Sequence, residues 1–227
     1  MAKKVLTQTI SEPLDGAKTA KIDINPGDGN LTIESLAYGE PVLVSGALEY
    51  LENQGVPVCS VTTQLGLATL TLKSKNGKQP WLRMPWAACN GATTWQVHLN
   101  PSLPADISAR SSGGNLRLDL AGMQITRVTA ETGGGNIDLV LPDYAAGMIV
   151  LAKTGAGNVT LSLPGNRPAR IHATTGLGKV MMDPCFSPVD KNTYQSPDYE
   201  RAVNKVEITL TSGAGNVIVS TGAINRN

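Results

Sequence analysis

The chain has 227 residues, of which 41% are apolar and 4% aromatic, so it can bury a sizeable core as one domain or two lobes. Its 19 basic and 18 acidic residues give a net charge of +1 and form no basic block, which argues against nucleic acid as a partner. No stretch of 18 apolar residues is present, so the sequence predicts no membrane span.

The first hundred residues contain several short predicted strands. Apolar and polar residues alternate, as in half-buried strands, within residues 5–16, 19–35, 40–52, 58–73 and 95–99. The second of these runs contains a glycine corner that ends at Asn30, and a polar loop over residues 74–92 carries Trp81 and Trp86. We interpret residues 1–100 as an antiparallel sheet lobe, including one outlying repeat, that caps the segment after it.

From Ala105 onward the chain repeats one pattern: an alternating run, a Gly-rich corner that ends in Asn, and a second alternating run. The corner residue Asn115 recurs as Asn136 and Asn158, and two later copies place Lys179 and Asn216 at the same point. A period of 21 or 22 residues with two short strands and no helix is typical of a solenoid. The sequence therefore predicts an all-β fold, with a β-solenoid of two-strand coils over residues 101–227.

The strands that flank the corners predict how the coils stack. Equivalent residues are alike in size, and one apolar column before the corner consists of Ile107, Val128, Val150, Ile171 and Ile208. Stacked parallel coils require such columns, whereas an antiparallel meander with the same strands and inward faces does not, so we favour the solenoid. We attribute the Gly and Asn of each corner to backbone with positive φ. Stacked Asn side chains could also form a hydrogen-bonded ladder.

A segment over residues 184–205 interrupts the period before the last coil. Its aromatic side chains are candidates for contact with a partner, because loops carry function more often than scaffolds do. The alternative is that these rings pack over the last coil as a cap, and the tryptophans of the first lobe present the same choice. The candidate interaction surface consists of Phe186, Tyr194, Tyr199, Trp81 and Trp86.

No catalytic, cofactor-binding or metal-binding set emerges from the repeats. Their outward columns place no two carboxylates side by side, so the acid pair of a glycosidase is missing. His98 and His172 lie far apart in the sequence and have no triad or metal spacing around them. The corners lack the recurrent Asp of a calcium β-roll and the following helix of a dinucleotide loop. The column of Arg110, Glu131 and Lys153 predicts a structural ladder of surface ion pairs.

The three cysteines are Cys59, Cys89 and Cys185, an odd number without CxxC spacing, so the sequence predicts no zinc site. We expect three free thiols. A disulfide between Cys59 and Cys89 is the alternative in an oxidising compartment.

Three stretches together resemble a known family. They are WQVHLNPSLPADI, LRLDLAGMQITRVTAETGGGNIDLVLP and NTYQSPDYERAVNKVEITLTSGAGNVIV. They are similar to toastrack-type β-solenoid domains, a group that includes LiaF-like proteins of bacterial cell-envelope stress and proteins classed as putative adhesins. The resemblance implies an all-β module without known catalysis, at or near the envelope.

These observations predict a non-enzymatic binding or scaffold module of the cell envelope, with a protein or an envelope polymer as partner and no cofactor. The alternatives are a polysaccharide-active β-solenoid enzyme and a structural protein that self-assembles through its solenoid ends. The first residues, MAKKVLTQTISEPLDG, lack the apolar segment of a secretory signal. We expect a cytoplasmic protein as the sequence stands, or an envelope-associated one if a native anchor has been removed.

Overall fold

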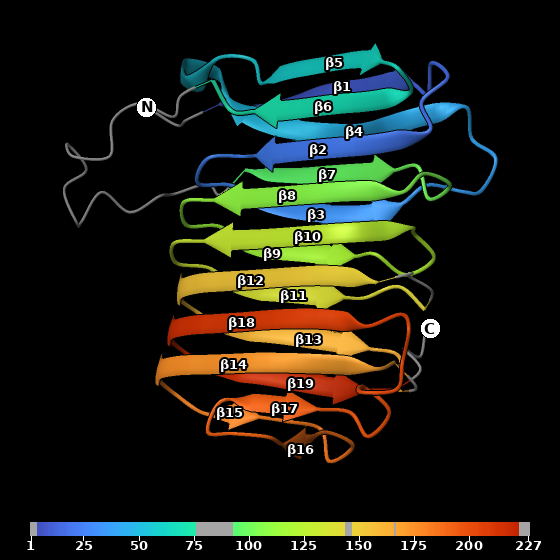
Figure 1. Ribbon diagram of the computed structural model, residues 1–227. Helices are drawn as coiled ribbons and strands as arrows, with labels where there is room; N and C mark the ends of the chain where they lie inside the picture. The colour runs from blue at the N-terminus through green and yellow to red at the C-terminus, as the bar shows by residue number, and fades with distance from the viewer. Residues whose placement is uncertain (1–3, 76–92, 144–146, 166, 223–227) are drawn as a thin grey trace.

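The computed structural model describes residues 4–75, 93–143, 147–165 and 167–222, which form two long sheets that face each other (Figure 1). Sheet A contains, in spatial order, β1 (Val5–Pro13), β4 (Val42–Leu51), β7 (Thr94–Leu99), β3 (Asn30–Ser35), β9 (Leu116–Asp119), β11 (Ile137–Val140), β13 (Val159–Leu163), β19 (Val217–Thr221) and β15 (Val180–Met181). Sheet B contains β16 (Ser187–Pro188), β17 (Thr193–Gln195), β14 (Ala169–Leu177), β18 (Val206–Ala214), β12 (Met148–Ala156), β10 (Ile125–Thr132), β8 (Ala105–Ser111), β2 (Thr19–Asn25), β6 (Leu67–Lys73) and β5 (Val58–Gln64). The helical structure of the described residues is a single short 3₁₀ turn, Glu52–Gln54. The described part of the chain thus contains no helix that is long and apolar enough to cross a membrane.

Each coil contributes one strand to each sheet, and equivalent strands of neighbouring coils pair in parallel. Ile107 lies beside Val128, which lies beside Val150, so the apolar column predicted from the repeat is present. This parallel register confirms the solenoid and excludes the meander for these coils. The inward side chains of both sheets are buried in one continuous core. Each inward side chain therefore packs against the equivalent side chain of the next coil.

The order of the coils in space departs from their order in the sequence. The coil formed by β18 and β19 comes last in the chain, yet it lies between the β12–β13 coil and the β14–β15 coil (Figure 1). In sheet B, Ile208 pairs with Val150 on one side and with Ile171 on the other. The coil that the insert covers at the end of the stack is therefore the β14–β15 coil and not the last coil of the chain. Every coil presents the same apolar column, so the repeat pattern does not encode which coils are neighbours.

Both sheets run past residue 100 without interruption. β2 pairs in parallel with β8, and β3 pairs in parallel with β9. β6 and β7 extend the two sheets by a further parallel strand each. The antiparallel strands of the N-terminal lobe are β1, β4 and β5, which complete the sheets at that end of the stack.

A ladder of asparagine side chains runs along the corners, as the sequence suggested. The side-chain oxygen of Asn115 accepts a hydrogen bond from the backbone N–H of Asn136 at 2.9 Å, and Asn136 accepts one from Asn158 at 2.8 Å. Asn158 in turn accepts from the N–H of Asn216 at 2.8 Å, and Asn216 accepts from Lys179 at 3.0 Å. The ladder begins at Asn30, whose side-chain oxygen accepts the N–H of Asn115 at 2.9 Å, and it follows the spatial order of the coils. The last of these six corners has Lys in place of Asn.

A second ladder, which the sequence analysis missed, lies just inside the first. From Asn115 onward, the Ser or Thr four positions before each corner residue donates its hydroxyl to a glycine carbonyl of the neighbouring coil. Thr132 donates to Gly114 at 2.8 Å and Thr154 donates to Gly135 at 2.7 Å. Both Thr side chains are buried, so these bonds satisfy backbone carbonyls that water does not reach. Ser111, Ser212 and Thr175 make the equivalent bonds.

The glycine before each corner Asn is required mainly by close contact between coils. A Cβ built on Gly114 or Gly135 would collide with the backbone of the coil beside it, at Gly29 and Gly114 respectively. Neither of these two glycines has positive φ, and none of the described Asn residues does. Our expectation that the corners need positive φ is therefore wrong for the Asn residues and for these glycines. It holds for Gly157, Gly178 and Gly215, which combine positive φ with the same close contact.

The ladder predicts a specific effect of the corner asparagine. We expect Asn136→Ala to lower the free energy of unfolding by about 1–2 kcal/mol, because the N–H of Asn158 loses its acceptor. Asn136→Asp keeps an acceptor oxygen at that point and should be far less damaging. Urea denaturation of the two variants measures the difference. An Asp variant as unstable as the Ala variant would show that the acceptor is not what this position contributes.

Candidate functional site

The residues between β15 and β18 form a cap over the C-terminal end of the stack, at the bottom of Figure 1. β17 pairs antiparallel with β14 and places Tyr194 opposite Ile171, and β16 pairs antiparallel with β17. Ser196 closes the end of this pairing, because its N–H donates to the Ala169 carbonyl and its hydroxyl accepts from the Ala169 N–H, each at 3.0 Å. The cap extends sheet B beyond the last coil.

Asp183 fixes the start of the cap. Its Oδ1 accepts the N–H of Cys185 at 3.0 Å, and its Oδ2 accepts the N–H and the hydroxyl of Thr221 at 2.9 and 2.7 Å. These hydrogen bonds hold the pKa of the Asp183 carboxyl well below its usual range. The carboxylate thereby ties the first turn of the cap to the end of β19.

Tyr199 is the centre of the second half of the cap. Its ring is buried between two cations, with the guanidinium carbon of Arg170 4.3 Å and the Nζ of Lys205 4.7 Å from the ring centroid. Its hydroxyl donates to the carboxylate of Glu207 on β18. One ring thus connects β14, β18 and the cap, and each cation over its face adds attraction.

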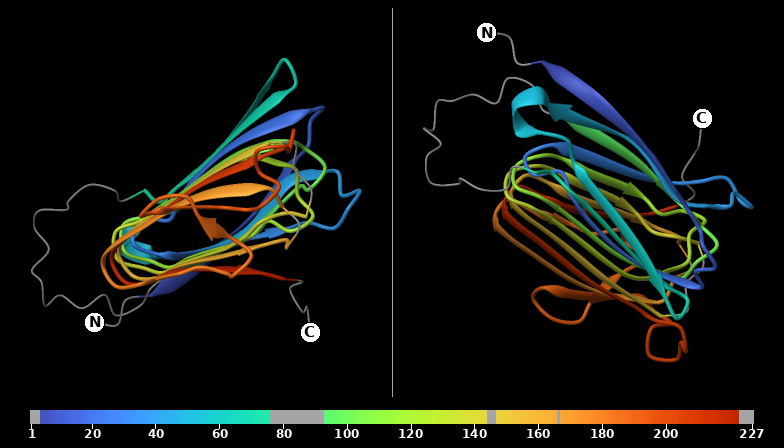
Figure 2. Two further views of the ribbon diagram at one scale, coloured as in Figure 1. Left: turned by 60° about the horizontal axis from the view of Figure 1, so that its bottom comes forward. Right: turned by 90° about the horizontal axis from the view of Figure 1, so that it is seen from above.

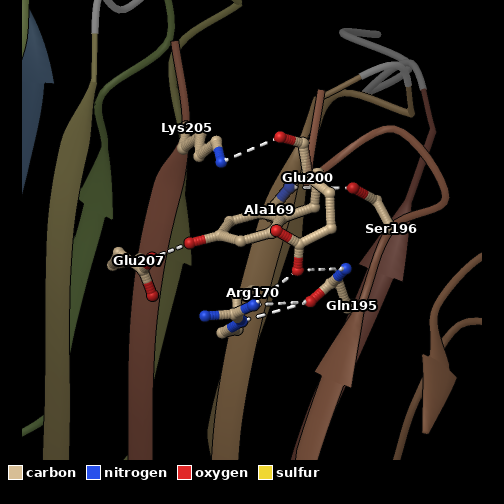
Figure 3. Close-up of polar contacts among 8 residues, drawn as sticks. Ala169, Arg170, Gln195, Ser196, Glu200, Lys205 and Glu207 are labelled. Carbon is tan, nitrogen blue, oxygen red and sulfur yellow. Dashed lines mark hydrogen bonds and ion pairs between the residues drawn. The ribbon is translucent and has the colours of Figure 1, made fainter. Parts of the chain in front are cut away.

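A network of polar side chains surrounds this ring (Figure 3). Arg170 donates from Nε and Nη2 to Gln195 Oε1 at 3.2 and 2.9 Å, and from Nη2 to Glu200 Oε1 at 2.9 Å. Gln195 Nε2 donates to the same oxygen of Glu200, and Lys205 Nζ donates to the Glu200 backbone carbonyl, both at 3.2 Å. Arg170 and Glu200 form an ion pair within this network, and its hydrogen bonds join β14 to the cap.

The structure assigns two of the predicted contact residues to packing. Phe186 belongs to the continuous core and Tyr199 is buried as described, so neither ring presents a surface to a partner, which corrects that part of the prediction. Tyr194 is half-buried and packs against the core from β17. Trp81 and Trp86 lie outside the described residues. The alternative that the aromatic residues of the insert form a cap therefore describes Phe186 and Tyr199.

The outer face of sheet B carries a row of ion pairs. Arg110 contacts Glu131 at 3.1 Å, as the column predicted, and it also contacts Asp23 at 3.3 Å. Lys73 extends the row by pairing with Asp23 at 3.0 Å. The row thus continues toward the N-terminal coils, whereas the column predicted that it would continue in the other direction, to Lys153 on β12. All of these side chains are partly exposed, so each pair contributes at most ~1 kcal/mol.

The remaining candidate residues are dispersed. His98 lies 3.6 Å from Glu34 on the outer face of sheet A, whereas the Nδ1 of His172 lies 3.3 Å from the hydroxyl of Thr193 in the cap. Cys59 is half-buried near Glu12, and both burial and that carboxylate raise the pKa of its thiol. Cys89 lies outside the described residues. Within the described part of the chain, no group of three or more His, Cys, Asp or Glu side chains could hold a metal ion.

Comparison with known proteins agrees with this architecture. A structure titled "putative cell adhesion protein" from Clostridium sporogenes has the same fold, with a TM-score of 0.86 and 23% identity over 96% of this chain and 100% of that chain. A "putative adhesin" from Bacteroides fragilis, 12% identical over 96% of this chain and 98% of that chain, has a TM-score of 0.33, too low to carry an argument. No curated protein matches the chain. The family model Toast_rack_N, the N-terminal domain of toast_rack (DUF2154), matches residues 1–162, more than half of the sequence, and the chain belongs to this family.

Proposed function

We propose that this protein is a non-enzymatic binding or scaffold module of the bacterial cell envelope. The observation that carries the proposal is the stack itself, whose interior is filled with apolar side chains from end to end. Any partner must therefore bind on the outside, where the fold offers two broad faces of parallel strands. The name of the Clostridium structure, a putative cell adhesion protein, supports a binding role at the envelope.

The outer face of sheet B is the surface we propose for binding. The ion pairs of Lys73, Asp23, Arg110 and Glu131 display both signs of charge on neighbouring strands, and Arg127 and Asp106 lie 3.9 Å apart beside them. Parallel strands repeat at about 4.8 Å, so the charges recur at a short and regular spacing. An extended envelope polymer or a peptide with charged groups could exchange these internal pairs for contacts of its own.

Co-sedimentation with isolated bacterial cell walls, and separately with anionic liposomes, tests the proposal. We expect the purified chain to pellet with walls and the variant Arg110→Gln to pellet less, because it loses the cation that joins Asp23 and Glu131 on the sheet B face. Arg117→Gln, on the outer face of sheet A, is the matched control and should pellet like the native chain.

Three outcomes of this experiment would count against the proposal. Absence of pelleting with both walls and liposomes would contradict the envelope role. An equal loss of pelleting in both variants would contradict the assignment to sheet B. Circular dichroism of each variant shows whether the fold is retained, so a loss caused by unfolding is recognised as such.

A further inference from the structure

The strand β5 forms the outer edge of sheet B at the N-terminal end of the stack, and no described strand pairs with that edge. Its sequence, VCSVTTQ, contains no charged residue and no proline, and its register with β6 has no bulge. Charges, prolines and bulges are the usual means by which proteins prevent an edge strand from pairing further. At the same end of sheet A, β1 has all three, with Glu12, Pro13 and a register shift between them. β5 is therefore an unprotected edge.

In the turn that joins β5 to β6, Leu65 occupies a position that is unfavourable for a leucine in a single copy of the chain. Leu65 has a φ of 51° and Gly66 a φ of 81°, the pattern of a type I′ turn, whose first position favours Asn, Asp or Gly. A bulky apolar residue with positive φ is a genuine outlier. Leu65 is also fully exposed, with a relative accessibility of 109%. The position thus combines backbone strain with an apolar side chain in water.

Other exposed apolar side chains lie at the two ends of the same hairpin. Val56 and Val58 are each 49% exposed before and at the start of β5, and Leu67 is 43% exposed after the turn. Figure 2 shows the β5–β6 hairpin at the end of the stack, where β5 is the terminal strand of sheet B. An apolar group beside an unprotected edge is typical of an interaction surface.

We propose that two copies of this chain pair through this edge, with β5 antiparallel to β5 of the second copy about a twofold axis at Val61. In a two-residue type I′ hairpin the residues that flank the turn form a hydrogen-bonded pair, so Gln64 and every second residue before it bond to β6. Cys59, Val61 and Thr63 therefore direct their backbone N–H and C=O groups to the free edge. With Val61 opposite itself, Cys59 of one copy pairs with Thr63 of the other.

The twofold arrangement accounts for the exposed apolar residues. Residues at equal distances from Val61 meet across the axis, so Leu65 of one copy falls beside Val56 and Val58 of the other. Antiparallel self-pairing places no like charges opposite each other, because β5 has none. These two features favour a second copy over an unrelated strand as the occupant. The inference goes beyond the proposed function and does not depend on it.

Sedimentation velocity over a wide range of protein concentration tests the pairing. We expect a reversible dimer whose dissociation constant rises about tenfold or more in Leu65→Asn, since each copy loses an exposed apolar side chain that the second copy would cover. The same substitution should raise the thermal midpoint of the dilute, monomeric chain, because Asn tolerates the positive φ that strains Leu65. If Leu65 instead stabilised the fold of the single copy, Leu65→Asn would lower the thermal midpoint of the monomer.

Two further variants complete the test. Val61→Pro removes an N–H that faces the free edge and spares the bonds to β6, so it should abolish the dimer. Leu177→Asn changes another exposed leucine, 76% accessible on β14 far from this end, and should leave the dimer intact. A chain that is monomeric at every concentration would overturn the inference. So would a dimer that survives Leu65→Asn, a result that is decisive even if the proline variant fails to fold.

Discussion

Gly135→Ala is expected to prevent the stack from folding cooperatively or to lower the free energy of unfolding by more than about 3 kcal/mol. A Cβ at this position would overlap the backbone of Gly114 in the neighbouring coil. That backbone cannot move away without breaking the bonds that Thr132 and Asn136 make to the same corner. Overpacking is usually relieved by rotation of a side chain, but here both partners are main chain.

The adjacent glycine provides a matched control for this prediction. Gly134 occupies the same turn, and a Cβ built on it would have no atom within 4 Å. Gly134→Ala should therefore change stability by less than about 1 kcal/mol, since its only effect is on backbone freedom. Urea denaturation followed by circular dichroism measures both variants. Similar stabilities for the two would show that the close approach of the coils is not what requires glycine at position 135.

Tyr199→Ala is expected to open the C-terminal cap at a cost of about 3–5 kcal/mol to the region that the ring holds together. The substitution removes a buried aromatic ring together with its contacts to Arg170 and Lys205. Once the cap opens, the outer edge of β14 loses its pairing with β17. We therefore expect faster backbone hydrogen exchange in β14 and β17 and more aggregation on heating. Hydrogen-exchange mass spectrometry and light scattering measure these two effects.

Tyr199→Phe separates the ring from its hydroxyl. It keeps the packing and the two cations but loses the bond to Glu207, so the expected cost is about 1 kcal/mol. The exposed carboxylate of Glu207 regains water when the bond is lost, which limits the penalty. Equal effects of the Phe and Ala variants would mean that the hydroxyl, not the buried ring, is the main attachment of the cap.

The repeat was sufficient to predict the architecture of a coil but not the order of the coils. Alternation identified the inward columns, and the similar size of Ile107, Val128 and Val150 indicated parallel stacking, which the register confirms. The same similarity conceals the neighbours of the last coil, because Ile208 would pack equally well beside Ile171 alone or between two coils. Order along the stack depends on the path of the insert, and that path has no periodic signal.

The predictions for individual side chains were less complete, for a different reason. The hydroxyl ladder was visible as a Ser or Thr four positions before each corner residue, yet its partners lie in the neighbouring coil and follow only from the register. The composition of the insert indicated that its aromatic residues matter. It could not distinguish a ring such as Tyr199, enclosed by Arg170 and Lys205, from one that faces a partner.

The interleaved position of the β18–β19 coil has a consequence for synthesis of the chain. The coils formed by β8–β9, β10–β11 and β12–β13 are neighbours both in the sequence and in space, and they can assemble as they leave the ribosome. The β14–β15 coil emerges next but lacks its native partner strands, because β18 and β19, which separate it from β12 and β13, are made last. A nascent chain paused before residue 206 thus exposes two unpaired edges at once. Folding during synthesis can therefore complete the stack only as far as the β12–β13 coil. The β14–β15 coil can take its native place only after β18 and β19 have left the ribosome.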